Sequence, residues 1–295
     1  MTDASEKPFA DWIGRTSESE DMLTERLAAS FRAIFGKHLA PVADGAAPLG
    51  IHWCLSPSIA GMDELGPDGH PAKNRDLPPV PQPRRMWAGG SVETFGELRI
   101  GDRVSRTSSI ADVTRKTGKS GELWFVAVDH VYSTERGIAI RERHDIVYRE
   151  AARPAPANSA AAPNMAPAER PFQRSVQVTT SPVILFRYSA ITFNGHRIHY
   201  DLPYATEVEG YSGLVVHGPI QATLLFNMAA TEIGAAPRKF DYRGLSAAIA
   251  GTGIFVRRGI GAEADTYWTQ GESGAIHMEA RSQQYASGVD LVRIT

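Results

Sequence analysis

The sequence predicts an α+β fold in which two antiparallel sheets each wrap around a central helix. Three observations favour this fold. The segment 218–234 is apolar on nearly every side, which indicates a buried helix. Strand-rich segments precede residue 150 and return after residue 239. An Ala/Pro-rich stretch, 151–171, lies between these two strand-rich parts, so the same layout occurs twice.

The first predicted element is a helix over residues 16–36. Ser17 and Glu20 have the spacing of a capping box, and Gly36 can end the helix. Its apolar face consists of Leu23, Leu27, Phe31 and Ile34. The segment 56–90 is rich in proline, which is disfavoured in helix interiors and central strands. We therefore expect a long ordered loop or lid there, and such loops are often functional.

Strands dominate the rest of the first half. The segments Trp124–Tyr132 and Ile138–Tyr148 are rich in β-branched and aromatic residues. Gly118, Gly121 and Gly137 mark the turns between the strands. A helix followed by antiparallel hairpins is typical of an α+β unit.

The stretch 151–171 is predicted to be a linker between an N-terminal unit, 1–150, and a C-terminal unit, 172–295. Fourteen of its 21 residues are Ala or Pro, so it has extended character. The C-terminal unit is expected to begin with a strand at 173–188, followed by a loop at 194–217 that can contain a short helix. Its central helix would follow, and then come strands at Ala247–Val256, Glu263–Thr269, Ala275–Gln284 and Val289–Ile294. One helix wrapped by an antiparallel sheet, twice over, is a double hot-dog fold.

Composition excludes several classes of function. The 295 residues carry a net charge of −2 with a pI near 6.5, so we expect no nucleic-acid or anionic-membrane partner. Because Cys54 is the only cysteine, no disulfide can form within the chain, which favours a reducing, cytoplasmic location. No apolar run approaches the ~18 residues of a membrane helix. HExxH, CxxC and P-loop patterns are absent, so no metal or nucleotide is expected.

A histidine-rich stretch before the central helix carries the candidate chemistry. His199 follows Asn194 by five residues, and His217 and Gly218 stand at the start of the helix. Histidine suits proton transfer near neutral pH because its ordinary pKa is ~6.5. A helix N-terminus offers free N–H donors for a developing enolate oxygen. The pattern therefore fits addition of water to a double bond conjugated with a thioester.

The stretch Ser189–His199 with Asp201 and the His-Gly-Pro helix start resembles the signature of the MaoC-like enoyl-CoA hydratases. The resemblance places His199 on the catalytic histidine and Gly218 on the glycine whose N–H receives the thioester oxygen. Asn194 stands where that family has its catalytic Asp. Because an Asn side chain cannot take up a proton, Asn194 can only orient water, and His199 must act as the base.

The sequence is more similar to the type 2 hydroxyacyl-thioester dehydratases and the mesaconyl-C4-CoA (3-methylfumaryl-CoA) hydratases. The shared motifs are GIHWC, LGPDGHP, LPPVPQPRRMWAGG, KSGELWFV and TFNGHRIHYD. This resemblance implies reversible hydration of mesaconyl-C4-CoA to citramalyl-CoA by a homodimer without a cofactor. The alternatives are itaconyl-CoA hydration, dehydration of a 3-hydroxyacyl thioester of fatty acid synthesis, a hot-dog thioesterase, and a catalytically silent acyl-CoA-binding subunit.

His196 and His217 are further candidates for substrate binding. Structural roles compete with these functional ones, because Asn194 can cap a loop, His196 can brace it, and His217 can position the helix start. If the substrate is a dicarboxylic acyl-CoA, its distal carboxylate needs a bidentate partner, for which Arg is suited. The candidates are Arg187, Arg197, Arg84 and Arg85, of which the last two can instead meet CoA phosphates. The N-terminal unit shows no recognisable catalytic residue and is expected to shape the acyl-CoA groove.

Overall fold

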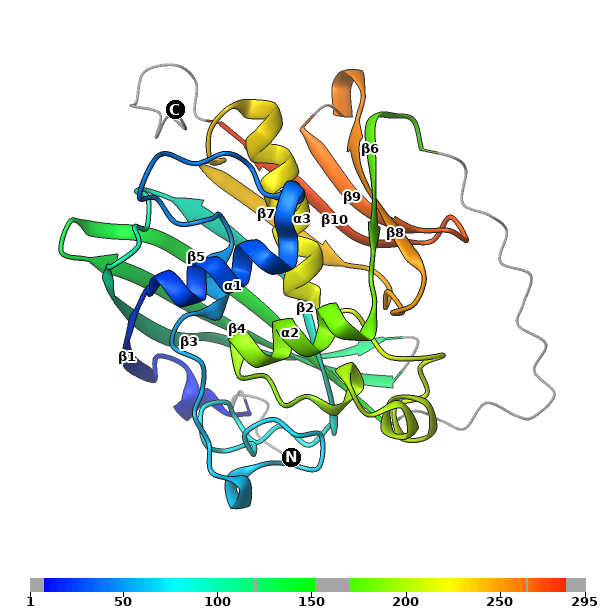
Figure 1. Ribbon diagram of the computed structural model, residues 1–295. Coiled ribbons are helices and arrows are strands. Elements are labelled where there is room, and N and C mark those ends of the chain that lie inside the picture. The colour runs from blue at the N-terminus through cyan, green and yellow to red at the C-terminus, as the bar shows by residue number, and fades with distance from the viewer. Residues whose placement is uncertain (1–7, 119–120, 152–169, 264, 285–295) are drawn as a thin grey trace.

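A computed structural model describes residues 8–118, 121–151, 170–263 and 265–284 (Figure 1). A ten-stranded antiparallel sheet has the order β1-β3-β4-β5-β2-β7-β10-β9-β8-β6. Its strands are β1 (Thr16–Met22), β2 (Arg84–Thr94), β3 (Arg103–Gly118), β4 (Gly121–Thr134), β5 (Gly137–Arg149), β6 (Phe172–Thr179), β7 (Lys239–Gly244), β8 (Gly253–Gly259), β9 (Thr266–Gly271) and β10 (Ile276–Gln283). The α-helices are α1 (Glu25–Phe35), α2 (Pro182–Thr192) and α3 (Gly218–Ile233).

The sheet contains the strands of both halves of the chain. Five strands come from residues 16–149 and five from residues 172–283, and β2 pairs with β7 where the halves meet. Figure 1 shows α1 and α2 in front of the N-terminal strands, with the C-terminal strands curving around α3. The predicted pair of helix-wrapping sheets is therefore joined edge to edge. The predicted linker lies mostly outside the described residues, so the domain division at 151–171 stays a prediction.

Helix α3 is the buried helix that its sequence predicts. Every residue from Ile220 to Ala230 is buried, and Gly234 ends the helix in the left-handed conformation. Pro219 fits the first turn because that position needs no backbone donor. Burial on all sides fixes α3 against the sheet, so its N-terminus is held in a defined place inside the molecule.

The predicted helix at 16–36 is wrong for its first third. Residues 16–22 form β1, an edge strand that pairs with β3, and α1 begins only at Glu25. Thr24 caps the helix by accepting a hydrogen bond from the N–H of Leu27 at 3.2 Å, so Ser17 has no capping role. Pairing with a distant strand outweighs the local capping-box spacing.

Two other boundaries differ from the sequence prediction. The proline-rich loop ends before Arg84, because residues 84–94 form the central strand β2. The predicted strand 173–188 is divided into β6 and the helix α2, which starts at Pro182 in its first turn. The predicted strands Trp124–Tyr132 and Ile138–Tyr148 are confirmed within β4 and β5.

The strands after α3 are shifted from their predicted positions. Residues 239–244 form β7, which was not predicted as a separate strand, and β8, β9 and β10 each begin one to six residues later than predicted. The predicted strand at 289–294 lies outside the described residues. Within the residues that the structure describes, no helix is long and apolar enough to span a membrane.

Candidate active site

Both halves of the chain line one cavity of about 580 Å³. The C-terminal half contributes the 194–199 loop and the first residues of α3, whereas the N-terminal half contributes β2 to β5 and the proline-rich loop. The lining includes His70, Arg85, Trp87, Arg106, His130, Glu142, His144, Asn194, His196, His199, His217 and Gly218. All three residues predicted to act in catalysis therefore face the same space.

His199 ends the short 3-10 helix η5 (Arg197–His199) and is buried. Its Nδ1 lies 2.7 Å from the carbonyl oxygen of Val215. A carbonyl only accepts hydrogen bonds, so Nδ1 carries the proton and Nε2 keeps a lone pair. Burial lowers the pKa of His199 to about 3, against a smaller raising effect of the Val215 hydrogen bond. The imidazole is therefore neutral at neutral pH and can accept a proton at Nε2.

His217 holds the base against the start of α3. Its ring stacks on His199 with a centroid separation of 3.5 Å and an interplanar angle of 15°. Its Nε2 lies 2.9 Å from the hydroxyl of Ser189 on α2. Burial and the neighbouring histidines hold the pKa of His217 well below its usual range. This supports the predicted positioning of the helix start, because His217 is the N-cap residue of α3.

Gly218 is the first residue of α3, so its N–H has no acceptor within the helix. A β-carbon at this position would lie 2.2 Å from Cε3 of Trp87 on β2. The indole of Trp87 therefore leaves no room for a side chain at position 218. Approach of a thioester to the backbone N–H would require a glycine there as well. The free N–H and the positive end of the helix dipole favour negative charge at this point.

Asn194 lines the cavity, but its side-chain oxygen is already engaged. Oδ1 accepts a hydrogen bond from the backbone N–H of His196 at 3.0 Å, which is the loop-capping arrangement. The Nδ2 group is the remaining polar part of this side chain. Asn194 can therefore donate a hydrogen bond to a water molecule, but an amide cannot take up the water's proton.

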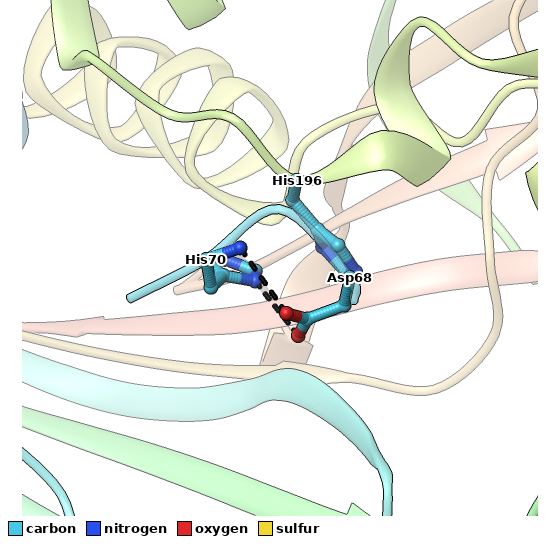
Figure 2. Close-up of side chains that lie close together, drawn as sticks. All are labelled: Asp68, His70 and His196. Atoms are coloured by element: carbon cyan, nitrogen blue, oxygen red, sulfur yellow. Dashed lines mark hydrogen bonds and ion pairs between the residues drawn. The ribbon is translucent and has the colours of Figure 1, made fainter. Parts of the chain in front are cut away.

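A carboxylate reaches the histidine cluster from the proline-rich loop of the N-terminal half. Figure 2 shows Asp68, His70 and His196 side by side. Nδ1 of His70 lies 3.2 Å from Oδ2 of Asp68, and the rings of His70 and His196 lie 4.2 Å apart. The ring of His196 in turn contacts His199 edge-on at 5.4 Å. The imidazole rings of His70 and His196 therefore lie between Asp68 and the candidate base, His199.

The charge of Asp68 is stabilised locally. Burial would raise the pKa of this carboxyl, but the hydrogen bond from His70 and the charge of Arg85 outweigh burial and hold the pKa well below its usual range. Nε of Arg85 lies 3.1 Å from Oδ2. The site therefore contains an ionised carboxylate even though Asn194 occupies the position expected for one.

The two loops that carry this cluster are docked to each other. The N–H of Arg197 donates to the carbonyl oxygen of Asp68 at 2.9 Å. A β-carbon on Gly69 would lie 2.1 Å from the carbonyl oxygen of Gly195, and Gly69 has a φ of +85°. Glycine is required there by both the close approach and the backbone conformation. The DGHP and NGHR segments consequently form one unit.

Asp68 and His70 were not among the site residues predicted from the sequence. The structure places ligand atoms of Asp68, His70 and His196 within 4.8 Å of one another. Oδ1 of Asp68 accepts from the His70 N–H, and Oδ2 from His70 and Arg85. A guanidinium on the carboxylate disfavours a second cation, so the geometry fits a hydrogen-bonded ion pair better than a metal centre. The LGPDGHP motif was the signal that could have identified these residues.

Three of the four predicted carboxylate-binding arginines are engaged elsewhere. Arg84 pairs with Glu209, Arg85 with Asp68, and Arg197 with Asp201. Arg187 is exposed on α2 and does not line the cavity. Arg85 is the one member of this set that lines the cavity, and both its Nε and its Nη2 already donate within the proline-rich loop.

The fold is a double hot-dog with one cavity shared by its two halves. A MaoC-like dehydratase from Phytophthora capsici superposes with a TM-score of 0.61 at 16% identity, covering 94% of this chain and 98% of that one. A Mycobacterium tuberculosis protein described as a double hot-dog has a TM-score of 0.53 at 11% identity, over 92% of this chain and 95% of that one. These likenesses confirm the predicted fold.

The sequence comparisons give the family. Residues 50–250 match the family of type 2 hydroxyacyl-thioester dehydratases. The mesaconyl-C(4)-CoA hydratase of Chloroflexus aurantiacus is 42% identical over 220 residues, which cover 74% of this chain and 77% of the relative. The chain belongs to the type 2 hydroxyacyl-thioester dehydratase family. This membership confirms the enzyme class predicted from the sequence, a hydro-lyase acting on acyl thioesters.

Proposed function

We propose that the protein catalyses reversible addition of water to an α,β-unsaturated acyl-CoA thioester at the cavity shared by its two halves. One observation carries the proposal. A neutral histidine with a free lone pair, His199, is stacked on the residue directly before the free N–H of Gly218. A proton acceptor and an oxyanion donor thus lie next to each other inside one cavity, which is the arrangement that hydration requires.

The reaction follows from these positions. Nε2 of His199 takes a proton from water as the water oxygen bonds to Cβ, and Nδ2 of Asn194 helps to hold that water. The π electrons move to the thioester oxygen, whose enolate charge the N–H of Gly218 stabilises. The imidazolium then returns its proton to Cα, so the enzyme is unchanged and one water has been added. Because the pKa of His199 is low, return of the proton is favourable. Water is the only co-substrate, so we propose that no cofactor or metal is needed.

The proposed substrate is mesaconyl-C4-CoA, which hydration converts to citramalyl-CoA. Support comes from the identity of 42% to a relative named for that substrate. The family match supports a second candidate, dehydration of a 3-hydroxyacyl thioester in fatty acid synthesis. Itaconyl-CoA is a third candidate with the same chemistry.

A turnover panel tests this proposal. The purified protein would be given 3-methylfumaryl-CoA, itaconyl-CoA, crotonyl-CoA and a 3-hydroxyacyl-CoA, with loss of enone absorbance and product mass as readouts. We expect the highest kcat/KM for 3-methylfumaryl-CoA. A much higher value for crotonyl-CoA would contradict the proposed substrate. Release of free thiol would indicate a thioesterase, and absence of turnover with all four would favour a silent acyl-CoA-binding subunit.

We also propose a homodimer in the cytoplasm. Hot-dog units associate through their sheets, and β1 and β6 are the edge strands of this sheet. The single cysteine, Cys54, is free and buried, which is compatible with a reducing compartment. Light scattering would contradict the dimer if it gave the monomer mass of 32.0 kDa. Fractionation of the producing cells would test the location.

A further inference from the structure

The wall of the cavity formed by strands β3, β4 and β5 is polar. Arg106, His130, Glu142 and His144 all line the cavity from strands β3, β4 and β5. His130 pairs with Ser108 on one side and with Glu142 on the other. Side chains two residues apart on a strand share a face, so Arg106 and His144 lie on the same face as this row. The wall is therefore a cluster of polar groups that no role in proton transfer explains.

Two polar atoms of this wall are buried and have no hydrogen-bond partner among the residues that the structure describes. They are Nε2 of His144 and Nε of Arg106. Arg106 donates from Nη1 to the carbonyl oxygen of Leu55 at 3.4 Å, and among the described residues its guanidinium forms no ion pair. Buried polar groups are normally satisfied, so two unsatisfied groups on one cavity wall indicate a polar ligand. The charge of Arg106 lowers the pKa of Glu142, but no ion pair joins these two described side chains. A partly buried guanidinium outside an ion pair favours an anionic ligand.

The wall is within reach of the reacting atoms. Trp87 contacts the Gly218 position with its ring atoms, and its ring centroid lies 5.6 Å from that of His144. One indole therefore separates the oxyanion donor from the unsatisfied His144. A short acyl chain whose thioester oxygen meets Gly218 places its far end beside this wall.

We propose that Arg106 and His144 bind a carboxylate at the far end of the acyl group, so that the substrates are dicarboxylic acyl-CoA thioesters. This inference deepens the proposed function, on which its placement of the thioester rests. Arg106 supplies the charge and a fork of N–H donors, and His144 supplies an Nε2–H donor. The sequence had indicated four other arginines for this role. Three of them are held in ion pairs, and the fourth, Arg187, does not line the cavity.

The acidic group of the wall does not oppose this ligand. The Oε1 of Glu142 accepts from Trp53 Nε1 at 2.8 Å, and Oε2 accepts from the hydroxyl of Tyr132 at 3.2 Å. Burial raises the pKa of Glu142 to about 7, although these hydrogen bonds and the charge of Arg106 act against burial. A second carboxylate nearby raises that pKa further and keeps Glu142 protonated. His130 is neutral, because burial and the charge of Arg106 lower its pKa to about 3.

Binding of saturated thioesters tests the inference without requiring turnover. Calorimetry would compare succinyl-CoA and glutaryl-CoA with butyryl-CoA, which lacks the second carboxylate. We expect at least one dicarboxylic thioester to bind about tenfold or more tighter than butyryl-CoA, since a charge-assisted hydrogen bond is worth about ten- to a hundredfold in affinity. Arg106→Gln should reduce this preference to about twofold or less while leaving butyryl-CoA binding unchanged. Equal affinities in the unaltered protein, or a preference that survives Arg106→Gln, would overturn the inference.

Two further variants keep the test decisive. Arg143→Gln removes a guanidinium from the opposite face of β5, where Arg143 pairs with Asp129, and should retain the full preference. His144→Phe should weaken binding of the dicarboxylic thioester by about tenfold and leave binding of butyryl-CoA unaffected. This variant provides the test if Arg106→Gln fails to fold. A protein that shows the preference but hydrates no enoyl-CoA would refute the proposed function and leave the carboxylate subsite standing.

Discussion

The two halves of the molecule line the same cavity but carry their polar side chains in different ways. In the C-terminal half, His199, His217 and Gly218 lie close together in the sequence around the start of α3. In the N-terminal half, Arg106 and His144 come from separate strands and meet only when the sheet forms. A group of residues on one continuous segment can be recognised from sequence, whereas a wall assembled across strands cannot. The N-terminal half, in which no catalytic residue could be recognised from the sequence, therefore still contributes polar groups to the cavity.

Replacing the proposed base should have the largest effect. His199→Ala removes the Nε2 acceptor, and we expect kcat/KM for enoyl-CoA hydration to fall about 10³-fold, within the range for loss of a general base. Binding of a saturated acyl-CoA should persist, because the variant leaves the helix start in place. The matched control is His277→Ala, which removes another histidine that lines the cavity and should retain activity. Unchanged hydration by His199→Ala would assign proton transfer to a different group.

Gly218→Ala tests where the two halves touch. The new β-carbon would lie 2.2 Å from Trp87, so the indole or the helix start must move. We expect kcat to fall about 10²-fold, comparable with loss of one oxyanion donor. Gly96→Ala is the control, since a β-carbon there meets only ordinary contacts at 3.8 Å.

A double variant distinguishes two causes of lost activity in Gly218→Ala, displacement of the Trp87 indole and blocked access of the thioester to the N–H. If displacement of the indole causes the loss, Trp87→Leu in the same chain should restore part of the activity. If the added methyl instead blocks the approach of the thioester, Trp87→Leu should give no recovery. Full activity of Gly218→Ala alone would contradict the assignment of this N–H as the oxyanion donor.

The loop carboxylate should have a smaller effect than the base. Asp68→Asn keeps an oxygen for His70 but removes the negative charge, and we expect kcat/KM to fall about tenfold because an imidazolium formed at His199 loses a stabilising charge. The variant should also lower the melting temperature, because it breaks the buried ion pair with Arg85. The expected signature of a role in proton transfer is therefore a changed pH dependence of kcat/KM. Asp63→Asn alters an exposed acid of the same loop and should have no effect. An unchanged pH profile for Asp68→Asn would limit Asp68 to a structural role.

Glu142 is expected to affect the pH dependence of the free energy of unfolding rather than the rate of hydration. Its pKa in the folded state is about 7, raised from 4.5, so between these values the folded protein binds the additional proton. The contribution of this group to the free energy of unfolding is therefore fully present below pH 4.5 and is lost as the pH rises through about 7. Relative to Glu142→Gln, we expect the unaltered protein to lose about 3 kcal/mol across this interval in denaturant titrations. Parallel stability curves for the two proteins would contradict the raised pKa.

Much of the C-terminal half could be predicted from the sequence. The apolar sequence of α3 leads directly to a buried helix, and the His-Gly-Pro start places its N-terminus. The errors have a common physical cause, which is that long-range pairing overrides local propensity. Residues 16–22 have helical capping spacing but form an edge strand with β3. Arg84 and Arg85 were predicted to bind the substrate, but the structure holds them in ion pairs with Glu209 and Asp68, which depend on tertiary contacts that no spacing reveals.

A crystal structure with bound succinyl-CoA tests most directly whether the C-terminal half binds the thioester and the N-terminal half binds the distal carboxylate. We expect the thioester oxygen to lie about 3 Å from the backbone nitrogen of Gly218, and the distal carboxylate to lie about 3 Å from the guanidinium of Arg106 or from Nε2 of His144. Arg85 and Arg243, which lies on β7, also line the cavity. A thioester at Gly218 with its carboxylate in solvent, or paired with one of these two arginines instead, would contradict the assignment of the N-terminal wall as the carboxylate subsite.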